Sequence, residues 1–81
     1  MQDLSEFKTS DLALASFLKL EGYKILQVVK KNTRTAEFYF QNVKREDLIS
    51  YQNGSSTVEP RDFASQMRQL NQTARMVVRD N

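Results

Sequence analysis

The stretch that decides the fold is YKILQVVKKNTRTAEFYFQ, residues 23–41. Residues 23–31 and 35–41 each predict a β-strand, because apolar and aromatic side chains are frequent in both and alternate cleanly with polar ones in the second. Residues 31–34 form a polar turn, and a turn this short joins two antiparallel strands into a hairpin. The side chains expected to form the core face of this hairpin are Leu26, Val28, Ala36, Phe38 and Phe40.

The segments on either side of the hairpin supply one further strand and three helices. In chain order we expect a strand at residues 6–9, a helix at 11–21, a helix at 43–53 and a helix from Pro60 to about Arg79. Gly22 is suited to end the first helix, Asn42 to cap the second, and Pro60 to occupy the first position of the third.

This order of elements predicts one α+β domain over residues 1–81. Its small three-stranded sheet follows the order strand, helix, strand, strand, helix, helix along the chain, and the helices pack mainly on one face. A right-handed crossover through the first helix would place the first strand parallel to one of the hairpin strands.

The composition removes most catalytic chemistry. The 81 residues include no His and no Cys, so the chain has no imidazole base, thiolate nucleophile or zinc ligand of these types. Gly22 and Gly54 are the only glycines, which excludes a glycine-rich phosphate loop. We therefore expect no enzyme, no metal and no cofactor.

The location is also predicted from simple patterns. Residues 1–6 have neither the basic start nor the apolar run of a secretory signal, and the apolar runs elsewhere are too short to cross a membrane. We expect a soluble, cytoplasmic protein with no membrane partner. Because the net charge is only +2, the placement of the charges tells more about partners than their sum does.

Two groups of residues resemble a known family. The first comprises Phe7-Lys8-Thr9-Ser10-Asp11-Leu12, Leu14-Ala15, Leu18, Gly22-Tyr23-Lys24, Leu26 and Val28. The second comprises Tyr51, Asn53-Gly54, Val58-Glu59-Pro60-Arg61, Phe63 and Leu70. Together they resemble a family of small uncharacterised proteins from bacteria and their phages, over roughly residues 6–75.

The resemblance implies a shared fold and a bacterial or phage origin. Because that family carries no assigned activity, it transfers no functional residues to this chain. A regulator or an anti-defence factor is the role that the association with mobile DNA suggests, which is an association and not a physical argument.

The first candidate site is a row of arginines on the last predicted helix. Arg61, Arg68, Arg75 and Arg79 are spaced 7, 7 and 4 residues apart, so they lie within about 40° of one another on a helix. No acidic residue stands four positions from Arg68 or Arg75. The row suits phosphates or carboxylates. The alternative is a solvated polar helix face, or a row that Glu46, Asp47 or Glu59 neutralises.

The second candidate is the tip of the hairpin, where Lys30, Lys31 and Arg34 form a basic group. Such a group can contact the backbone of a nucleic acid. The alternative is that lysines at a turn or sheet edge prevent edge-to-edge pairing with another sheet.

The third candidate is the outer face of the sheet, on which Tyr23, Ile25, Val29 and Tyr39 would lie together. Exposed aromatic and aliphatic side chains could form a protein interface or stack on unpaired bases. The alternative is that a terminal helix covers them.

These observations favour a small non-enzymatic binding module that contacts a nucleic-acid backbone through a basic helix face. The alternative is a protein–protein interaction module: a phage or bacterial regulator, inhibitor or anti-defence factor, or a homodimer. The small core and the open sheet edges support that second interpretation.

Overall fold

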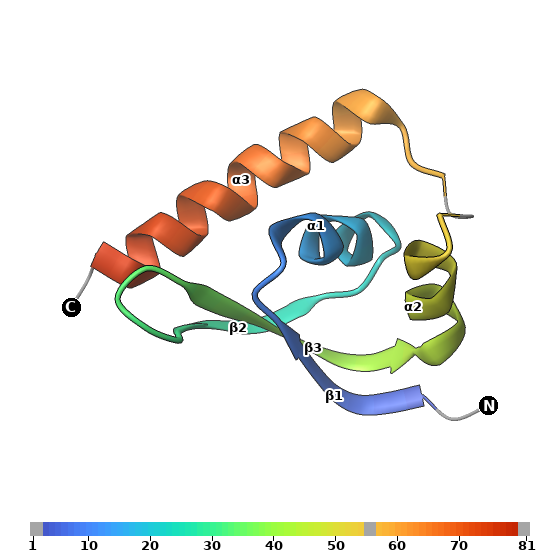
Figure 1. Ribbon diagram of the computed structural model, residues 1–81, viewed down its shortest axis with the longest axis horizontal. Helices are drawn as coiled ribbons and strands as arrows, with labels where there is room; N and C mark the ends of the chain where they lie inside the picture. The colour runs from blue at the N-terminus through green and yellow to red at the C-terminus, as the bar shows by residue number, and fades with distance from the viewer. Residues whose placement is uncertain (1–2, 55–56, 80–81) are drawn as a thin grey trace.

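The computed structural model describes residues 3–54 and 57–79. Its elements, in chain order, are β1 (Asp3–Thr9), α1 (Leu12–Leu20), β2 (Ile25–Lys30), β3 (Ala36–Lys44), α2 (Arg45–Gln52) and α3 (Pro60–Arg79). The predicted α+β class and the predicted order of elements are confirmed (Figure 1). No helix in the described ranges is both long and apolar enough to span a membrane.

The sheet has the strand order β1-β3-β2, and β3 pairs antiparallel with both neighbours. The expectation that the first strand runs parallel to a hairpin strand holds for its direction relative to β2, although these two strands are not hydrogen-bonded to each other. β1 does run in the same direction as β2, as a right-handed crossover requires, but β3 lies between them and takes the hydrogen bonds of both. β3, which follows β2 in the chain, is thus the middle strand of the sheet.

An irregularity in β2 changes which side chains face the core. The register moves from Ile25 opposite Phe40 to Gln27 opposite Tyr39, so Leu26 has no partner in the ladder. Ile25 consequently packs against the core, whereas the Leu26 side chain is 54% exposed. The expectation that Leu26 shares the core face with Val28 is wrong for this reason.

Asn42 interrupts the alternation of inward-facing and outward-facing side chains near the end of β3. Phe40 and Val43 are both fully buried although they are three residues apart, which a regular strand does not allow. Asn42 between them adopts a left-handed backbone, with φ of 59°, and Asn tolerates this conformation better than most residues. The strand therefore continues past the predicted end at Gln41, and Asn42 does not cap the second helix.

The core lies between the sheet and the helices on one face. Its buried members are Ala15, Phe17, Leu18, Phe38, Phe40, Val43 and Leu70. Because α1, α3 and β3 all contribute to this cluster, both helices pack on the same sheet face. The Tyr51 ring of α2 packs against Phe17 at 5.2 Å between centroids. Burial raises the pKa of the Tyr51 hydroxyl, and the Asp11 carboxylate raises it further.

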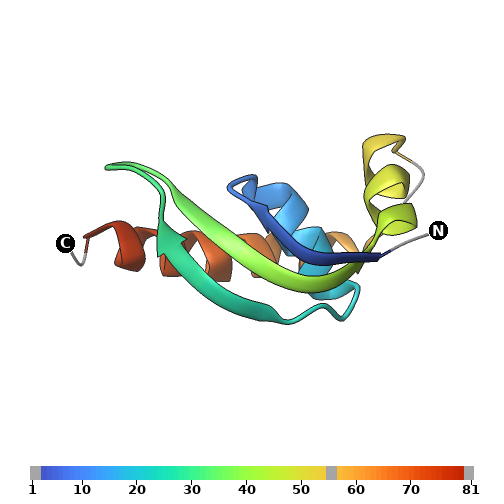
Figure 2. The ribbon, with the colours of Figure 1, turned by 90° about the horizontal axis from the view of Figure 1, so that it is seen from below.

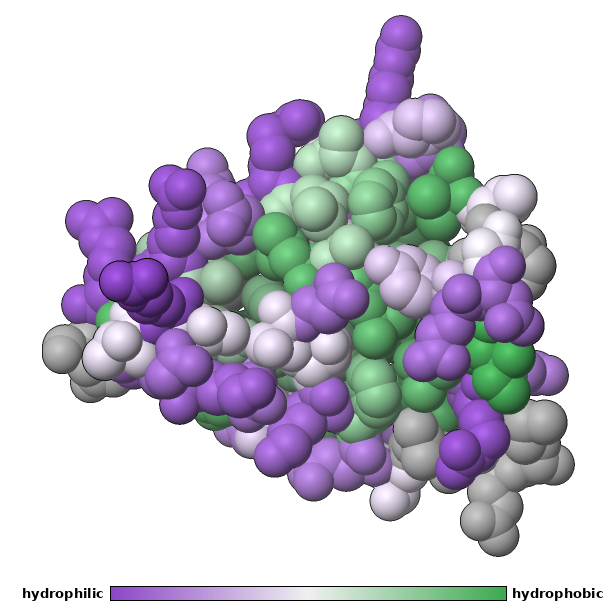
Figure 3. All heavy atoms as spheres, viewed as in Figure 1, coloured by the Kyte–Doolittle hydropathy of each residue, from purple (hydrophilic) through white to green (hydrophobic). Residues whose placement is uncertain are grey.

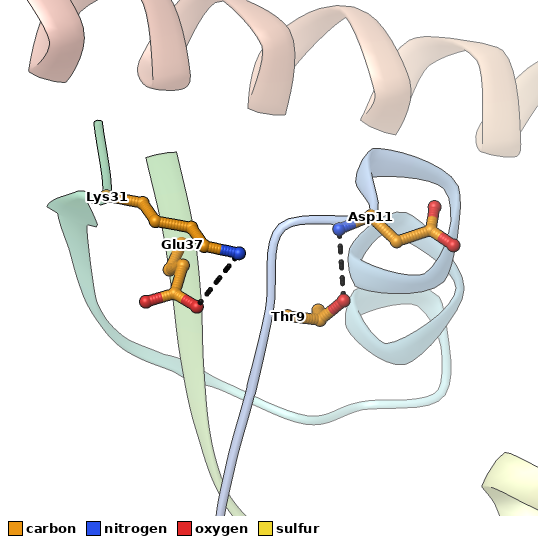
Figure 4. Close-up of polar contacts among 4 residues, drawn as sticks. All are labelled: Thr9, Asp11, Lys31 and Glu37. Atoms are coloured by element: carbon orange, nitrogen blue, oxygen red, sulfur yellow. Dashed lines mark hydrogen bonds and ion pairs between the residues drawn. The ribbon is translucent and has the colours of Figure 1, made fainter. Parts of the chain in front are cut away.

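Asp11 is the N-cap residue of α1. Its Oδ1 accepts hydrogen bonds from the backbone N–H groups of Ala13 and Leu14, at 3.0 and 3.2 Å. The Thr9 hydroxyl oxygen accepts from the Asp11 N–H at 3.0 Å (Figure 4). These bonds satisfy donors that the first turn of a helix otherwise leaves unpaired.

We predict that Asp11→Ala lowers the free energy of unfolding by about 1 kcal/mol, because two backbone donors lose their acceptor. Urea denaturation followed by circular dichroism measures this change. Asp11→Asn is the matched control, since it keeps the acceptor oxygen and should lose only a few tenths of a kcal/mol. Equal losses in both variants would contradict the capping role.

Candidate nucleic-acid interface

The arginine row on α3 is exposed along its whole length. Leu70 turns inward and is buried, whereas Arg61, Arg68, Arg75 and Arg79 all lie on the solvent side of the helix. Among the side chains that the structure describes, those of residues 5–54 and 57–79, the only ion pair joins Lys31 to Glu37. No described carboxylate therefore neutralises an arginine of the row by direct contact.

The row is not electrically uniform, because its first member lies among acids. The Glu59 carboxylate caps the start of α3 and accepts hydrogen bonds from the backbone N–H groups of Arg61 and Asp62, at 2.9 and 3.1 Å. Glu21, Glu59 and Asp62 also line one hollow at this end. Arg61 is separated from Arg79 by 18 residues, or about 27 Å of helix. The basic part of the row is thus its C-terminal half.

The hairpin tip has a defined turn. The backbone N–H of Lys31 donates to the Thr35 carbonyl at 2.8 Å, and the Asn32 side chain accepts from the Arg34 N–H at 2.9 Å. The second bond is an Asx-type turn, which holds the chain at Arg34 in a compact shape. The turn therefore sets the position from which the Arg34 side chain extends.

The basic residues of the tip divide between two faces. The Lys31 ammonium lies 4.0 Å from a carboxylate oxygen of Glu37 (Figure 4), and Glu37 belongs to the outer face of the sheet. Lys30 is half-buried at the end of β2, whereas Arg34 is exposed. Lys30 lies opposite the buried Ala36 and so shares the helix side of the sheet, while Arg34 is the member of the tip that lines a hollow together with residues of α3.

Arg34, Arg75 and Arg79 meet around one hollow with a volume of about 240 Å³. The sequence predicted two separate basic sites, and α3 joins parts of both because its C-terminal end lies beside the β2–β3 turn (Figures 1 and 2). Figure 3 shows that hydrophilic side chains dominate this end of the molecule, while apolar side chains gather nearer the middle of the same face. We call this hollow the arginine cleft; its lining is completed by Asn71, Ala74 and Val78.

The remaining lining of the arginine cleft was not singled out from the sequence. Ala74 and Val78 lie on the apolar face of α3, and both are half-buried. On a helix, Asn71 lies between that apolar face and the arginine row. This position at the border of the two faces is the signal that could have identified Asn71 as a lining residue. Arg68 lies on the same helix but does not line the cleft.

The outer face of the sheet does not hold the four residues expected there. Tyr23 and Ile25 pack against the core, and the Tyr23 hydroxyl donates to Asp47 and accepts from the Lys44 N–H at 3.0 Å. The bulge in β2 explains the change for Ile25. Only Val29 and Tyr39 remain on the outer face, beside charged and amide side chains.

Tyr39 on this outer face is paired with a cation. The Lys8 ammonium lies 5.9 Å from the centroid of the Tyr39 ring, within the range of a cation–π contact. Glu37 and Gln27 are its neighbours in the sheet. The described side chains of this face are therefore mixed in polarity and form no continuous apolar surface.

The arginine cleft is chemically an anion site. Each guanidinium group presents a planar fork of donors that matches the oxygens of a phosphate or a carboxylate. The partial negative charge at the C-terminal end of α3 opposes an anion, but it amounts to about half a charge, against three full positive charges in the lining.

The comparisons with known proteins give one result. The model of a domain of unknown function, DUF5659, matches residues 5–76. No curated protein and no solved structure is significantly similar to the chain.

Proposed function

We propose that this chain, which belongs to the DUF5659 family of domains of unknown function, is a small non-enzymatic module that binds the backbone of a nucleic acid. The observation that carries the proposal is the meeting of Arg34, Arg75 and Arg79 around one hollow. Arg68 extends the same basic surface along α3.

The proposal rests on backbone contacts and not on base reading. Guanidinium groups that neutralise phosphates release counterions, and this provides affinity without regard to sequence. Arg68, Arg75 and Arg79 lie on α3, and Arg34 lies beside the C-terminal end of this helix. A nucleic-acid strand can therefore run along α3 from Arg68 to the arginine cleft. No described element has the form of a known DNA-reading motif.

We predict a steep dependence of affinity on salt. If Arg34, Arg68, Arg75 and Arg79 each contact a phosphate, duplex affinity should fall about 100-fold between about 50 and 200 mM salt. Fluorescence anisotropy with labelled duplex and single-stranded oligonucleotides measures it. Absence of binding at tens of micromolar protein in low salt, or binding insensitive to salt, would refute the proposal.

The second candidate function is a protein–protein interaction module, favoured by one observation. Leu26 is 54% exposed on β2, a strand whose outer edge has no partner strand in the sheet. Sedimentation of the protein alone tests the homodimer form of this candidate. A dimer that Leu26→Lys dissociates would support it, whereas a strict monomer would remove the homodimer.

We further propose the origin of the protein, its cellular compartment and its biological role. A bacterial or phage origin is supported by the family resemblance over roughly residues 6–75. Action in the cytoplasm is consistent with a nucleic-acid ligand. A regulator or an anti-defence factor encoded on mobile DNA would have a use for a small module of this kind.

A further inference from the structure

The arginine cleft has a shape that a helix face alone would not have. Two segments line it: Arg34 comes from the β2–β3 turn, and Arg75 and Arg79 come from the last turns of α3. The hollow has a volume of about 240 Å³ and is open to solvent, so a phosphate group can enter it from outside. We infer that the arginine cleft binds a phosphate monoester, namely the terminal phosphate of a strand; this rests on the proposed function.

The charge of the lining favours a terminal phosphate over an internal one. A phosphate monoester carries about −1.5 to −2 charges at pH 7 and has three acceptor oxygens, whereas each internal phosphodiester carries one negative charge. The described lining contains three guanidinium groups and no carboxylate. A group with a higher charge and a third free oxygen therefore gains more from this site than an internal phosphate does.

The rest of the lining suits what is attached to the phosphate. Ala74 and Val78 form an apolar part of the hollow beside the arginines, and Asn71 adds an amide that can donate or accept a hydrogen bond. A terminal nucleotide presents both parts, a phosphate and a less polar sugar.

The test compares oligonucleotides of one sequence that differ only at their ends. Single strands with a 5′-phosphate, a 3′-phosphate or hydroxyl ends are titrated at one fixed ionic strength by anisotropy. We expect at least one phosphorylated end to bind about tenfold more tightly than the hydroxyl form. A difference below twofold for both ends would overturn the inference, and the proposed function would stand as long as the hydroxyl form binds.

Two variants locate the effect. Arg34→Gln changes an exposed turn residue of the cleft and should remove the preference for a phosphorylated end. Arg68→Gln, on the same basic surface but outside the cleft, should weaken all three oligonucleotides by a similar factor and keep the preference. A preference that survives in Arg34→Gln would contradict the assignment to the cleft.

Competition with free phosphates shows whether the cleft binds the end of a nucleic-acid strand or a small phosphate ligand. Inorganic phosphate and a nucleoside monophosphate are used as competitors against the phosphorylated strand. We expect these small phosphates to compete only at a much higher concentration than an unlabelled strand, because they lack the contacts along α3. A mononucleotide that binds as tightly as the strand would overturn the strand-end assignment. Failure of every oligonucleotide to bind would instead remove the proposed function.

Discussion

Replacing Arg75 and Arg79 together by glutamate is expected to abolish binding of oligonucleotides, with an increase in Kd of more than about 100-fold. Each replacement removes a guanidinium group from the arginine cleft and places a carboxylate where a phosphate would lie. The pair also lowers the net charge of the chain from +2 to −2. Anisotropy at low salt measures the loss.

A second double variant tests whether binding depends on the position of the charges or only on the net charge. Arg45→Glu with Arg61→Glu gives the same net charge, and both residues are exposed and lie outside the cleft. We expect this pair to weaken binding less than about tenfold, because only the long-range field changes. Equal losses in the two pairs would show that binding does not depend on the cleft.

The folded state should survive the first pair. Arg75 and Arg79 are exposed, so the cost to stability comes mainly from negative charge near the C-terminal end of α3, about 0.3–1 kcal/mol for a carboxylate in the last turn, at position 79. Substitution of both arginines by glutamine avoids this cost and should still reduce binding strongly. Circular dichroism of each variant confirms that the fold is intact before binding is compared.

The largest effect on stability is expected for Phe40→Ala, which should lower the free energy of unfolding by about 3–5 kcal/mol. Phe40 is fully buried at the centre of the sheet, opposite Phe7 on one side and Ile25 on the other. Its removal leaves a cavity among three strands. Because small domains have only about 5–15 kcal/mol of stability in total, this variant should lie close to unfolding.

Urea denaturation measures the change, and the adjacent aromatic residue provides the control. Tyr39→Ala removes a ring of similar size from the half-buried outer face and should cost less than half as much. Phe40→Leu is a milder variant for the case in which Phe40→Ala does not fold. Similar losses for the alanine variants at positions 39 and 40 would contradict the one-sided core.

The elements themselves were largely predictable because their signals are local. The alternation through Phe38 and Phe40 gave the third strand, and apolar residues at every third or fourth position gave α3. The pairing of β1 was not predictable in this way. Its alternation suits a parallel or an antiparallel neighbour equally, and only the position of β3 between β1 and β2 decides.

Two local features of the strands had ambiguous signals. Ile25 and Leu26 are both aliphatic, so the sequence does not show which of them a bulge turns inward. Asn42 favours a helix cap and a left-handed backbone alike, and the burial of Val43 selects the second. In both cases the choice follows from packing against residues distant in the chain.

The candidate site was predictable in its residues but not in its shape. The helical period placed Arg68, Arg75 and Arg79 on the solvent side, and the hairpin placed Arg34 at a turn. Their meeting depends on the way α3 crosses α1 and ends beside the hairpin (Figure 1). The way in which α3 crosses α1 is set by packing throughout the core, so neither the sequence of α3 nor that of the hairpin indicates it.

The most direct test of the arginine cleft is a nuclear magnetic resonance titration that follows the side-chain Nε–H signals of the arginines as a 5′-phosphorylated or 3′-phosphorylated strand is added. We expect the signals of Arg34, Arg75 and Arg79 to shift together with one midpoint, while that of Arg61 stays unchanged. An unshifted Arg34 signal, or shifts confined to the outer sheet face around Tyr39, would contradict it.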